Sequence, residues 1–410
     1  MNPLEKLVCR TVQTVFRLAI PLRPYRQPTI LKHLADIPAQ LTADGVTAVL
    51  LVTDPDLRRL GSTAALETLL ADAGIHCAVY DRTRPNPTVH NVEEAREVYV
   101  REGCQALIAF GGGSSMDCAK AVGARIAYPN RSLNGLKGLL RVLRRIPTLY
   151  AVPTTAGTGS EVTITAVITD PDAKHKYTMN DFALIPAYAV LDPEVTFTLP
   201  PHLTASTGMD ALTHVVEAYI GRSTTQETRA MALDTVRLIF TYLERAYADG
   251  RDRKARAMML RAAYQAGLVF SKSYVGYIHA VAHSLGGQYN IPHGLANAVI
   301  MPYVLESYGP CVHKKLHELG IAAGVCTPAQ SDEQAAAAFI HAIRDLNARM
   351  NIPAHLDGIQ ESDIPVMAAH AEKEANPLYP VPRLMTEEEL EGFYRQVAAV
   401  EDVRHGRRAS

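Results

Sequence analysis

The chain lacks several features that would assign it to particular protein classes. Its 410 residues include no tryptophan, and its six cysteines are scattered without any C-x-x-C pair. This cysteine pattern indicates neither a disulfide framework nor a zinc knuckle, and a reducing, cytoplasmic compartment fits it best. No apolar run approaches the ~18 residues that a membrane-spanning helix requires, so no membrane span is predicted.

The sequence also has little excess charge of either sign. Its formal net charge is -1 and no basic stripe is present, so it offers no electrostatic basis for binding nucleic acid. The 48% hydrophobic content over this length supports two domains with full cores. Residues 1–27 are basic and mildly amphipathic, but no small-residue cleavage site of a signal peptide follows them. This segment could contact a membrane surface or a partner, but we expect it to pack on its own fold or on a neighbouring subunit.

Strand-like and helix-like segments alternate through the first half of the chain. Four apolar runs predict buried strands: "TAVLLVTD", "HCAVYD", "CQALIAF" and "TLYAVP". Strands that alternate with helices at this interval imply a parallel sheet covered on both faces. Beyond the prolines near residue 198 the helical patterns dominate. We therefore predict an α/β domain over residues 1–198, with an N-terminal extension over 1–27, and a helical domain over 199–410.

Three consecutive glycines join the third strand to its helix in "AFGGGSSMDCAK". Because Gly111, Gly112 and Gly113 lack a Cβ atom, their N–H groups can approach a ligand closely. The helix that begins near Ser114 would point its positive dipole end at the same place, which suits a phosphate. The segment is neither G-x-G-x-x-G nor a P-loop, and a tight turn without a ligand would look similar.

Two further segments point to the same edge of the sheet. Asp54 follows the first strand, at the carboxyl edge where open α/β folds bind ligands. Its carboxylate could accept both hydroxyls of an adenosine ribose and repel a 2′-phosphate, or it could cap a helix, since a proline follows. In "VPTTAGTGSEVT", the hydroxyls of Thr154, Thr155 and Thr158 could donate to a pyrophosphate or line a nicotinamide pocket.

Four of the 15 histidines lie in two short segments of the second half. "YIHAVAHSLGGQYNIPHGLANA" carries His279, His283 and His293, and the first two share one face of a helix. The glutamate of the protease motif H-E-x-x-H is missing. In "GMDALTHVVEAY", Asp210 and His214 also lie four residues apart. One carboxylate with two or three imidazoles suits Fe²⁺ or Zn²⁺, but spacing alone does not divide the ligands from the other histidines.

Taken in order, "GGGSSMDCAK", "VPTTAGTGSEVT", "GMDALTHVVEAY" and "HAVAHSLGGQYNIPHGLANA" resemble the iron-containing (group III) alcohol dehydrogenases, from about residue 28 to about residue 400. The resemblance implies an N-terminal parallel-sheet dinucleotide-binding domain followed by an all-helical metal-binding domain, with NAD and Fe²⁺ as cofactors and Zn²⁺ as the alternative metal. It makes His283 a catalytic residue that does not bind the metal. It also implies that the metal ligands are Asp210, His214, His279 and His293. The matching cofactor-contacting positions are Asp54, Gly112, Gly113, Ser114, Asp117, Thr154, Thr155, Thr158 and Lys176.

The function that follows from the resemblance is an NAD-dependent, divalent-metal-dependent alcohol dehydrogenase. It would interconvert small primary alcohols or diols and aldehydes by hydride transfer, as a homodimer or a larger homo-oligomer. Thr165 and Phe270 match positions near the substrate, and some members of the family carry asparagine in place of Thr165.

Three alternatives stay open at this stage. A glycerol dehydrogenase or a dehydroquinate synthase would share the architecture but use zinc with a smaller or different ligand set. A metal-dependent hydrolase would need neither the glycine loop nor nicotinamide. A protein that binds a metal or a nucleotide without catalysis would keep the same motifs.

Overall fold

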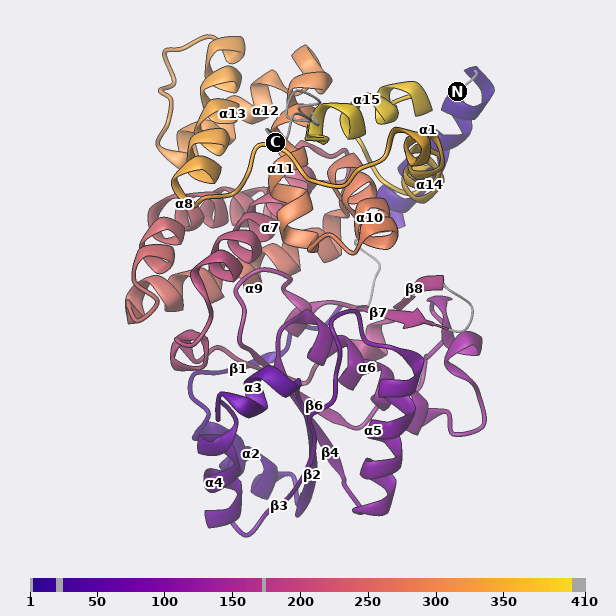
Figure 1. The fold of residues 1–410 in the computed structure, drawn as a ribbon, viewed down its shortest axis with the longest axis vertical. Coiled ribbons are helices and arrows are strands. Elements are labelled where there is room, and N and C mark those ends of the chain that lie inside the picture. Colours follow the sequence, from indigo (N-terminus) through magenta and orange to yellow (C-terminus); the bar gives the residue numbers. More distant parts are fainter. Residues whose placement is uncertain (1–2, 20–24, 172–174, 400–410) are drawn as a thin grey trace, which may run out of the picture.

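A computed structural model of the chain describes residues 3–19, 25–171 and 175–399. The first half is built on a six-stranded sheet, and the second half is a stack of helices above it (Figure 1). The predicted fold class, a parallel-sheet domain followed by a helical one, is confirmed. The division near residue 198 stays a prediction.

All pairings in the large sheet are parallel, and its strand order is β1-β9-β6-β4-β2-β3. From β2 the chain passes to β3 on one side and then returns to β4 on the other side. The point between β2 and β4 is therefore the topological switch point, where open α/β sheets bind ligands. The strands are β1 (Thr29–Leu31), β2 (Ala48–Val52), β3 (His76–Tyr80), β4 (Ala106–Gly111), β6 (Thr148–Pro153) and β9 (Tyr188–Val190).

The helices cover both faces of this sheet because side chains along a strand point alternately to opposite faces. Leu50 and Val52 of β2 pack in one core with α5 and α6, whereas Val49 and Leu51 pack in another core with α2 and α4. These helices are α2 (Asp36–Ala43), α4 (Ala64–Asp72), α5 (Val89–Arg101) and α6 (Gly113–Ala127), and a short α3 (Pro55–Arg59) follows β2.

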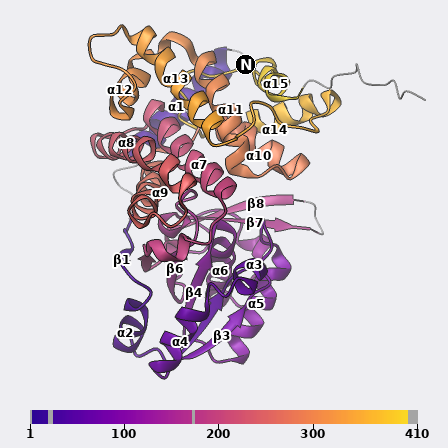
Figure 2. The same cartoon turned by 60° about the vertical axis from the view of Figure 1, so that its left-hand side comes forward.

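A second, smaller sheet lies at the boundary between the two halves (Figures 1 and 2). Its strand order is β5-β8-β7, and β7 and β8 form an antiparallel pair. The strands are β5 (Gly138–Leu139), β7 (Thr165–Asp170) and β8 (His175–Asn180). The four apolar runs of the sequence predicted β2, β3, β4 and β6. They did not predict this small sheet or the short strands β1 and β9.

The helical half encloses the largest hydrophobic core of the described chain. Its helices are α7 (Pro201–Ile220), α8 (Gln226–Ala248), α9 (Arg253–Ser273), α10 (Tyr277–Tyr289), α11 (His293–Tyr308), α12 (His313–Ala323), α13 (Asp332–Arg349), α14 (Ile364–Ala375) and α15 (Glu387–Val397). None of the described helices is both long enough and apolar enough to cross a membrane.

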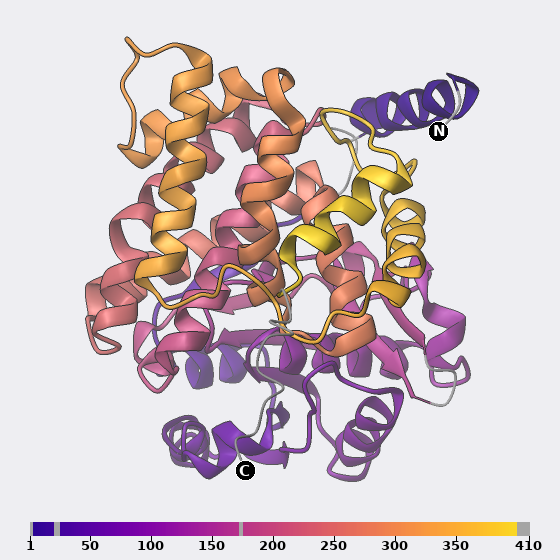
Figure 3. The same ribbon diagram turned by 45° about the horizontal axis from the view of Figure 1, so that its top comes forward.

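The N-terminal extension contains one helix, α1 (Pro3–Ala19), which lies at the edge of the helical half (Figure 3). From the sequence we predict that the extension, residues 1–27, belongs to the sheet domain. The described part of α1 instead forms hydrogen bonds with residues 379–382 of the helical half. Residues 20–24 of the extension lie outside the described residues.

Candidate functional site

Asp54 and the glycine turn lie on the two sides of the switch point, since they follow β2 and β4. Asp54 is the N-cap of α3: its Oδ1 accepts hydrogen bonds from the N–H groups of Asp56 (3.0 Å) and Leu57 (2.9 Å). The cap that the sequence offered as one interpretation is therefore present. It uses only Oδ1, so Oδ2 stays available to a ribose hydroxyl, and the two roles are compatible.

The three glycines form a turn that leaves little room for side chains, least of all at Gly111. A Cβ atom on Gly111 would lie 2.4 Å from the Ser115 hydroxyl oxygen, and one on Gly113 would lie 3.0 Å from the Thr158 methyl group. A Cβ on Gly112 would come within 3.3 Å of Thr155. The helix α6 begins at Gly113, so its first N–H groups point toward the turn. The turn and the threonine loop are thus in direct contact, as a dinucleotide cradle requires.

Buried polar contacts fix the threonine loop to α6. The Ser160 hydroxyl donates to Oδ1 of Asp117 at 3.0 Å, and the N–H of Val167 donates to Oδ2 at 3.1 Å. One turn further along α6, the fully buried Lys120 donates to Ser160 (2.9 Å) and to Thr163 (2.9 Å). Burial lowers the pKa of Lys120 to about 8. Both carboxylate oxygens of Asp117 thus accept hydrogen bonds from the protein itself. Lys120 also holds the loop in place, and the sequence motifs did not point to this role.

The remaining predicted cofactor residues lie around the same turn. The N–H of Asn86 donates to the Ser114 hydroxyl at 3.3 Å, and Nζ of Lys176 on β8 donates to Oδ1 of Asn86 at 2.8 Å. Nδ2 of Asn86 donates in turn to Oδ1 of Asn290, at the end of α10 (3.2 Å). Thr154 is buried, and the Thr155 hydroxyl is buried without a hydrogen-bond partner. These contacts join the edge of the sheet that carries the glycine turn to the helical half. The glycine turn, the first N–H groups of α6 and the threonine loop together fit an NAD pyrophosphate.

Three helices bring the predicted metal ligands together. Asp210 and His214 lie one turn apart on α7, His279 lies on α10, and His293 is the first residue of α11. Gly294 permits this approach, because a Cβ atom there would lie 2.4 Å from the Ser206 carbonyl oxygen of α7. One potential ligand atom from each of the four residues lies within 4.8 Å of the others, and Asp210, His214, His279 and His293 together form the ligand group.

The chemistry of this group fits a divalent cation. Nδ1 of His214 and Nε2 of His279 are buried without a hydrogen-bond partner, which is costly unless another group binds them. Burial lowers the pKa of His214, lowers that of His293 to about 4, and holds that of His279 well below 6.5. These rings are therefore neutral at pH 7, as metal ligands must be. Asp210 supplies the carboxylate: its Oδ1 lies 3.4 Å from Nε2 of His293 and 3.9 Å from Nε2 of His279.

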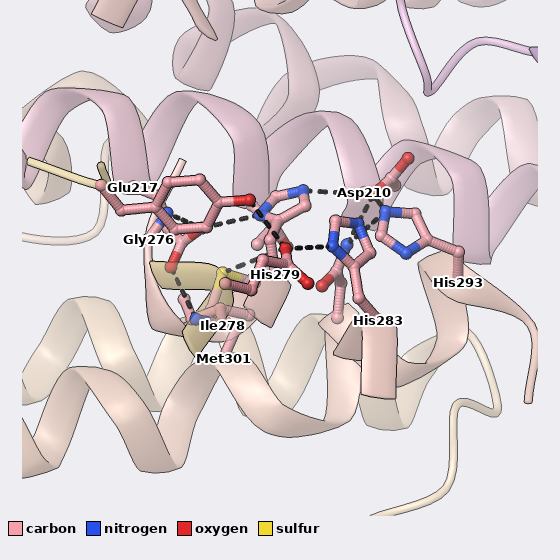
Figure 4. Close-up of polar contacts among 12 residues, drawn as sticks. Asp210, Glu217, Gly276, Ile278, His279, His283, His293 and Met301 are labelled. Atoms are coloured by element: carbon pink, nitrogen blue, oxygen red, sulfur yellow. Dashed lines mark hydrogen bonds and ion pairs between the residues drawn. The ribbon is translucent and has the colours of Figure 1, made fainter. Parts of the chain in front are cut away.

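Glu217 orients His279 from the side opposite to Asp210 (Figure 4). It lies on α7, and its carboxylate accepts the N–H groups of Gly276 and Ile278, both at 2.7 Å. Its Oε2 lies 2.6 Å from Nδ1 of His279. An acceptor here requires Nδ1 to carry the proton, which leaves the Nε2 lone pair facing Asp210. Burial raises the pKa of Glu217 to about 7. The sequence motifs did not point to Glu217. A carboxylate two turns after Asp210 on a buried helix could have indicated a residue that contacts the metal ligands.

Asn297 is a second residue that the sequence analysis missed. It is fully buried on α11, one turn after His293, and its Nδ2 donates to Oδ1 of Asp210 at 2.7 Å. The same nitrogen lies 3.1 Å from Nε2 of His293. Asn297 therefore orients the only carboxylate of the ligand group.

His283 lies beside the four residues of the ligand group but is not one of them. Its ring packs against that of His293 with centroids 5.0 Å apart, and its Nδ1 lies 2.6 Å from Oε1 of Glu374 on α14. The Tyr379 hydroxyl donates to the same carboxylate oxygen at 2.7 Å. Desolvation lowers the pKa of His283, but the charge and the hydrogen bond of Glu374, together with the charge of Asp210, outweigh it and the net shift is upward. His283 therefore carries a proton more readily than the buried histidines beside it.

The two residues predicted to lie near the substrate differ in their surroundings. Phe270 of α9 stacks on the His214 ring with centroids 4.2 Å apart, which places it directly beside the ligand group. Thr165 begins β7, and its hydroxyl donates to Oδ1 of Asn180 at 2.7 Å. Phe270 can thus form a wall next to the metal site, whereas the hydroxyl of Thr165 already has a partner.

Comparisons with known proteins place the chain in a family. The family model described as "Iron-containing alcohol dehydrogenase" matches residues 29–193, and that described as "Fe-containing alcohol dehydrogenase family, C-terminal" matches residues 204–398. The 1,3-propanediol dehydrogenase of Citrobacter freundii is 39% identical over 356 residues, which cover 86% of this chain and 92% of that protein.

Solved structures show the same relationship. A crystal structure of 1,3-propanediol oxidoreductase superposes with a TM-score of 0.87 at 35% identity, and it covers 92% of this chain and all of its own. The sulfoacetaldehyde reductase of Bifidobacterium kashiwanohense in complex with NAD⁺ gives a TM-score of 0.81 at 28% identity, over 92% of this chain and 99% of that one.

Proposed function

The chain belongs to the iron-containing alcohol dehydrogenase family, and from this we propose that it is an NAD-dependent, metal-dependent alcohol dehydrogenase acting on small primary alcohols or diols and the matching aldehydes. The family interconverts alcohols and aldehydes and uses NAD and Fe²⁺, the cofactors that the sequence predicted. The observation that carries the proposal is the group formed by Asp210, His214, His279 and His293. Two of its buried imidazole nitrogens, Nδ1 of His214 and Nε2 of His279, have no hydrogen-bond partner, and a bound cation would provide one.

The contacts between the two halves support a shared reaction site. Gly157 of the threonine loop packs so closely on α7 that a Cβ atom there would lie 2.5 Å from the Thr207 carbonyl oxygen. Thr207 precedes Asp210 by less than one helical turn. A cofactor held by the glycine turn and the threonine loop would thus end close to the ligand group.

Each group would have a distinct part in the reaction. When bound, Fe²⁺ or Zn²⁺ supplies Lewis-acid polarisation of the substrate oxygen, and NAD supplies the hydride acceptor. The neutral histidines and Asp210 would hold the cation. With Nδ1 of His283 bonded to Glu374, Nε2 is the ring nitrogen that can take the alcohol proton. Glu374 then stabilises the protonated ring.

The alternatives are less well supported by the same residues. A zinc-dependent relative with a smaller ligand set would not need four potential ligand atoms so close together, three of them on buried residues. A hydrolase would leave the glycine cradle without a use. We further propose that the protein assembles as a homodimer or a larger homo-oligomer.

The function is tested by assaying the anaerobically purified protein, loaded with Fe²⁺ or with Zn²⁺, for NAD⁺ reduction. The substrates are ethanol, 1-propanol, 1,3-propanediol and glycerol, and the control is the same protein after chelation. We expect NADH to form with the primary alcohols or the diol only when the metal is present. The proposal is wrong if neither metal form reduces NAD⁺ with any of these alcohols.

Cofactor preference depends on Asp54. We expect NAD⁺ to be favoured over NADP⁺ by about 10²-fold in kcat/KM, because a carboxylate beside a 2′-phosphate costs several kcal/mol. Asp54→Gly should relax this preference, and glycine replaces the α3 cap at a cost of only about a few tenths of a kcal/mol. Asp56→Asn, an exposed charge change on the same helix, is the matched control and should leave the preference intact. Equal kcat/KM for both cofactors in the unaltered protein would exclude the ribose role.

A further inference from the structure

Helix α1 packs on its own protein through the side that carries Cys9, Arg10 and Gln13. Cys9 and Gln13 are buried, and Nε2 of Gln13 donates to the Tyr379 carbonyl oxygen at 2.7 Å. The Arg10 guanidinium donates to the carbonyl oxygens of Val381 at 2.8 Å and of residue 382 at 3.1 Å. These contacts hold the helix in one orientation on the helical half.

The opposite face of α1 is apolar and exposed. A surface helix normally turns its apolar stripe toward the core, so this arrangement is reversed. At 100° per residue the exposed apolar side chains fall within roughly 100° of the helix circumference, and all are more than half exposed. They are Leu4, Leu7, Val8, Val15 and Leu18, which are 51–70% exposed.

Helix α1 lies outside the part of the chain that the family models match. The family match begins at residue 29, and the 1,3-propanediol oxidoreductase structure is covered completely by 92% of this chain. The segment also differs in charge from the rest. Residues 1–28 contain five basic residues and one acidic residue, a net charge of +4, and the whole chain has -1, which leaves -5 for residues 29–410.

We propose that the outer face of α1 binds the surface of a membrane that contains anionic phospholipids, with the helix lying in the membrane plane. Such helices combine a leucine-rich face with basic residues on the polar face, and here Lys6 and Arg17 are exposed on that polar side. Each basic residue near an anionic bilayer strengthens binding roughly fivefold.

The charge distribution favours a lipid surface over a second copy of the helix. Helix α1 carries three basic residues, Lys6, Arg10 and Arg17, and one acidic residue, Glu5, so it has few complementary charges to offer a second copy of itself. Paired helices rely on complementary charges beside the seam, which this helix does not provide. Anionic lipid headgroups would complement the same basic residues.

The proposal is tested by flotation of the full-length protein with vesicles of phosphatidylcholine alone, or with about one third phosphatidylglycerol. Leu7→Glu/Leu18→Glu places two charges on the outer face without touching the anchoring residues. Leu60→Glu/Val100→Glu changes two equally exposed apolar residues of the sheet half and is the matched control. Melting temperature and dehydrogenase activity, which none of these substitutions should alter, report the fold.

We expect the unaltered protein and the control to bind the anionic vesicles, more weakly as salt is raised. The Leu7→Glu/Leu18→Glu variant should bind roughly 100-fold less, because two leucines lose their burial in the bilayer. The proposal is overturned if the unaltered protein does not bind, or if both double variants bind equally well. A change of oligomeric state in the Leu7→Glu/Leu18→Glu variant, without vesicle binding by the parent, would identify a second copy as the occupant.

Discussion

Replacing His279 by alanine is expected to remove the metal and the activity together. Nε2 of His279 is buried without a hydrogen-bond partner and faces Asp210, so its role as a ligand accounts for an otherwise costly burial. Without it, three ligands would remain. We expect substoichiometric metal after purification and a fall in kcat of roughly 10³-fold or more, because Lewis-acid polarisation contributes several kcal/mol.

Metal analysis of protein prepared anaerobically decides this, with the melting temperature as a check of the fold. His283→Ala is the matched control, since His283 lies one turn later on the same helix but outside the group of close ligand atoms. A folded His279→Ala protein with a full complement of metal would show that His279 is not a ligand, and the site would have to be built from the other residues.

The sequence predicts the fold wherever the hydrophobic pattern is long. β2 and β4 are continuous apolar runs because both faces of the sheet are covered. β1 has three residues that are exposed or half-buried, so it leaves no apolar run, and its place is determined by parallel pairing with β9. The placement of α1 is likewise decided by tertiary hydrogen bonds that no local pattern contains.

The site is predictable to the extent that its residues repeat at helical spacing. Asp210 and His214 share one face of α7, so the pair is visible in the sequence. Glu374 comes from α14, far along the chain from its partner His283, and no spacing rule connects them. The glycine turn is visible as "GGG", but only the structure shows which neighbours exclude side chains there.

His283→Ala is expected to leave the metal in place and to lower mainly kcat. Its Nδ1 is held by Glu374, and its ring lies beside that of His293 without belonging to the ligand group. A fifth protein ligand would also occupy the position that a catalytic metal keeps open for its substrate. Loss of one acid–base group typically lowers the rate by ~10²–10⁴-fold, and we expect a loss in this range at unchanged metal content.

The pH dependence of the reaction separates a proton-transfer role of His283 from a purely structural one. Alcohol oxidation requires a neutral ring that can accept a proton, so kcat should rise with pH through the pKa of His283, which lies above 6.5 because of Glu374. Glu374→Gln keeps a hydrogen-bonding side chain but removes the charge that raises this pKa, so the rise should move to lower pH. In His283→Ala the rise should disappear. If the His283→Ala protein folds but contains no metal, His283 is a metal ligand. An unchanged pH profile in both variants would place the proton acceptor elsewhere, with the cofactor ribose as the next candidate.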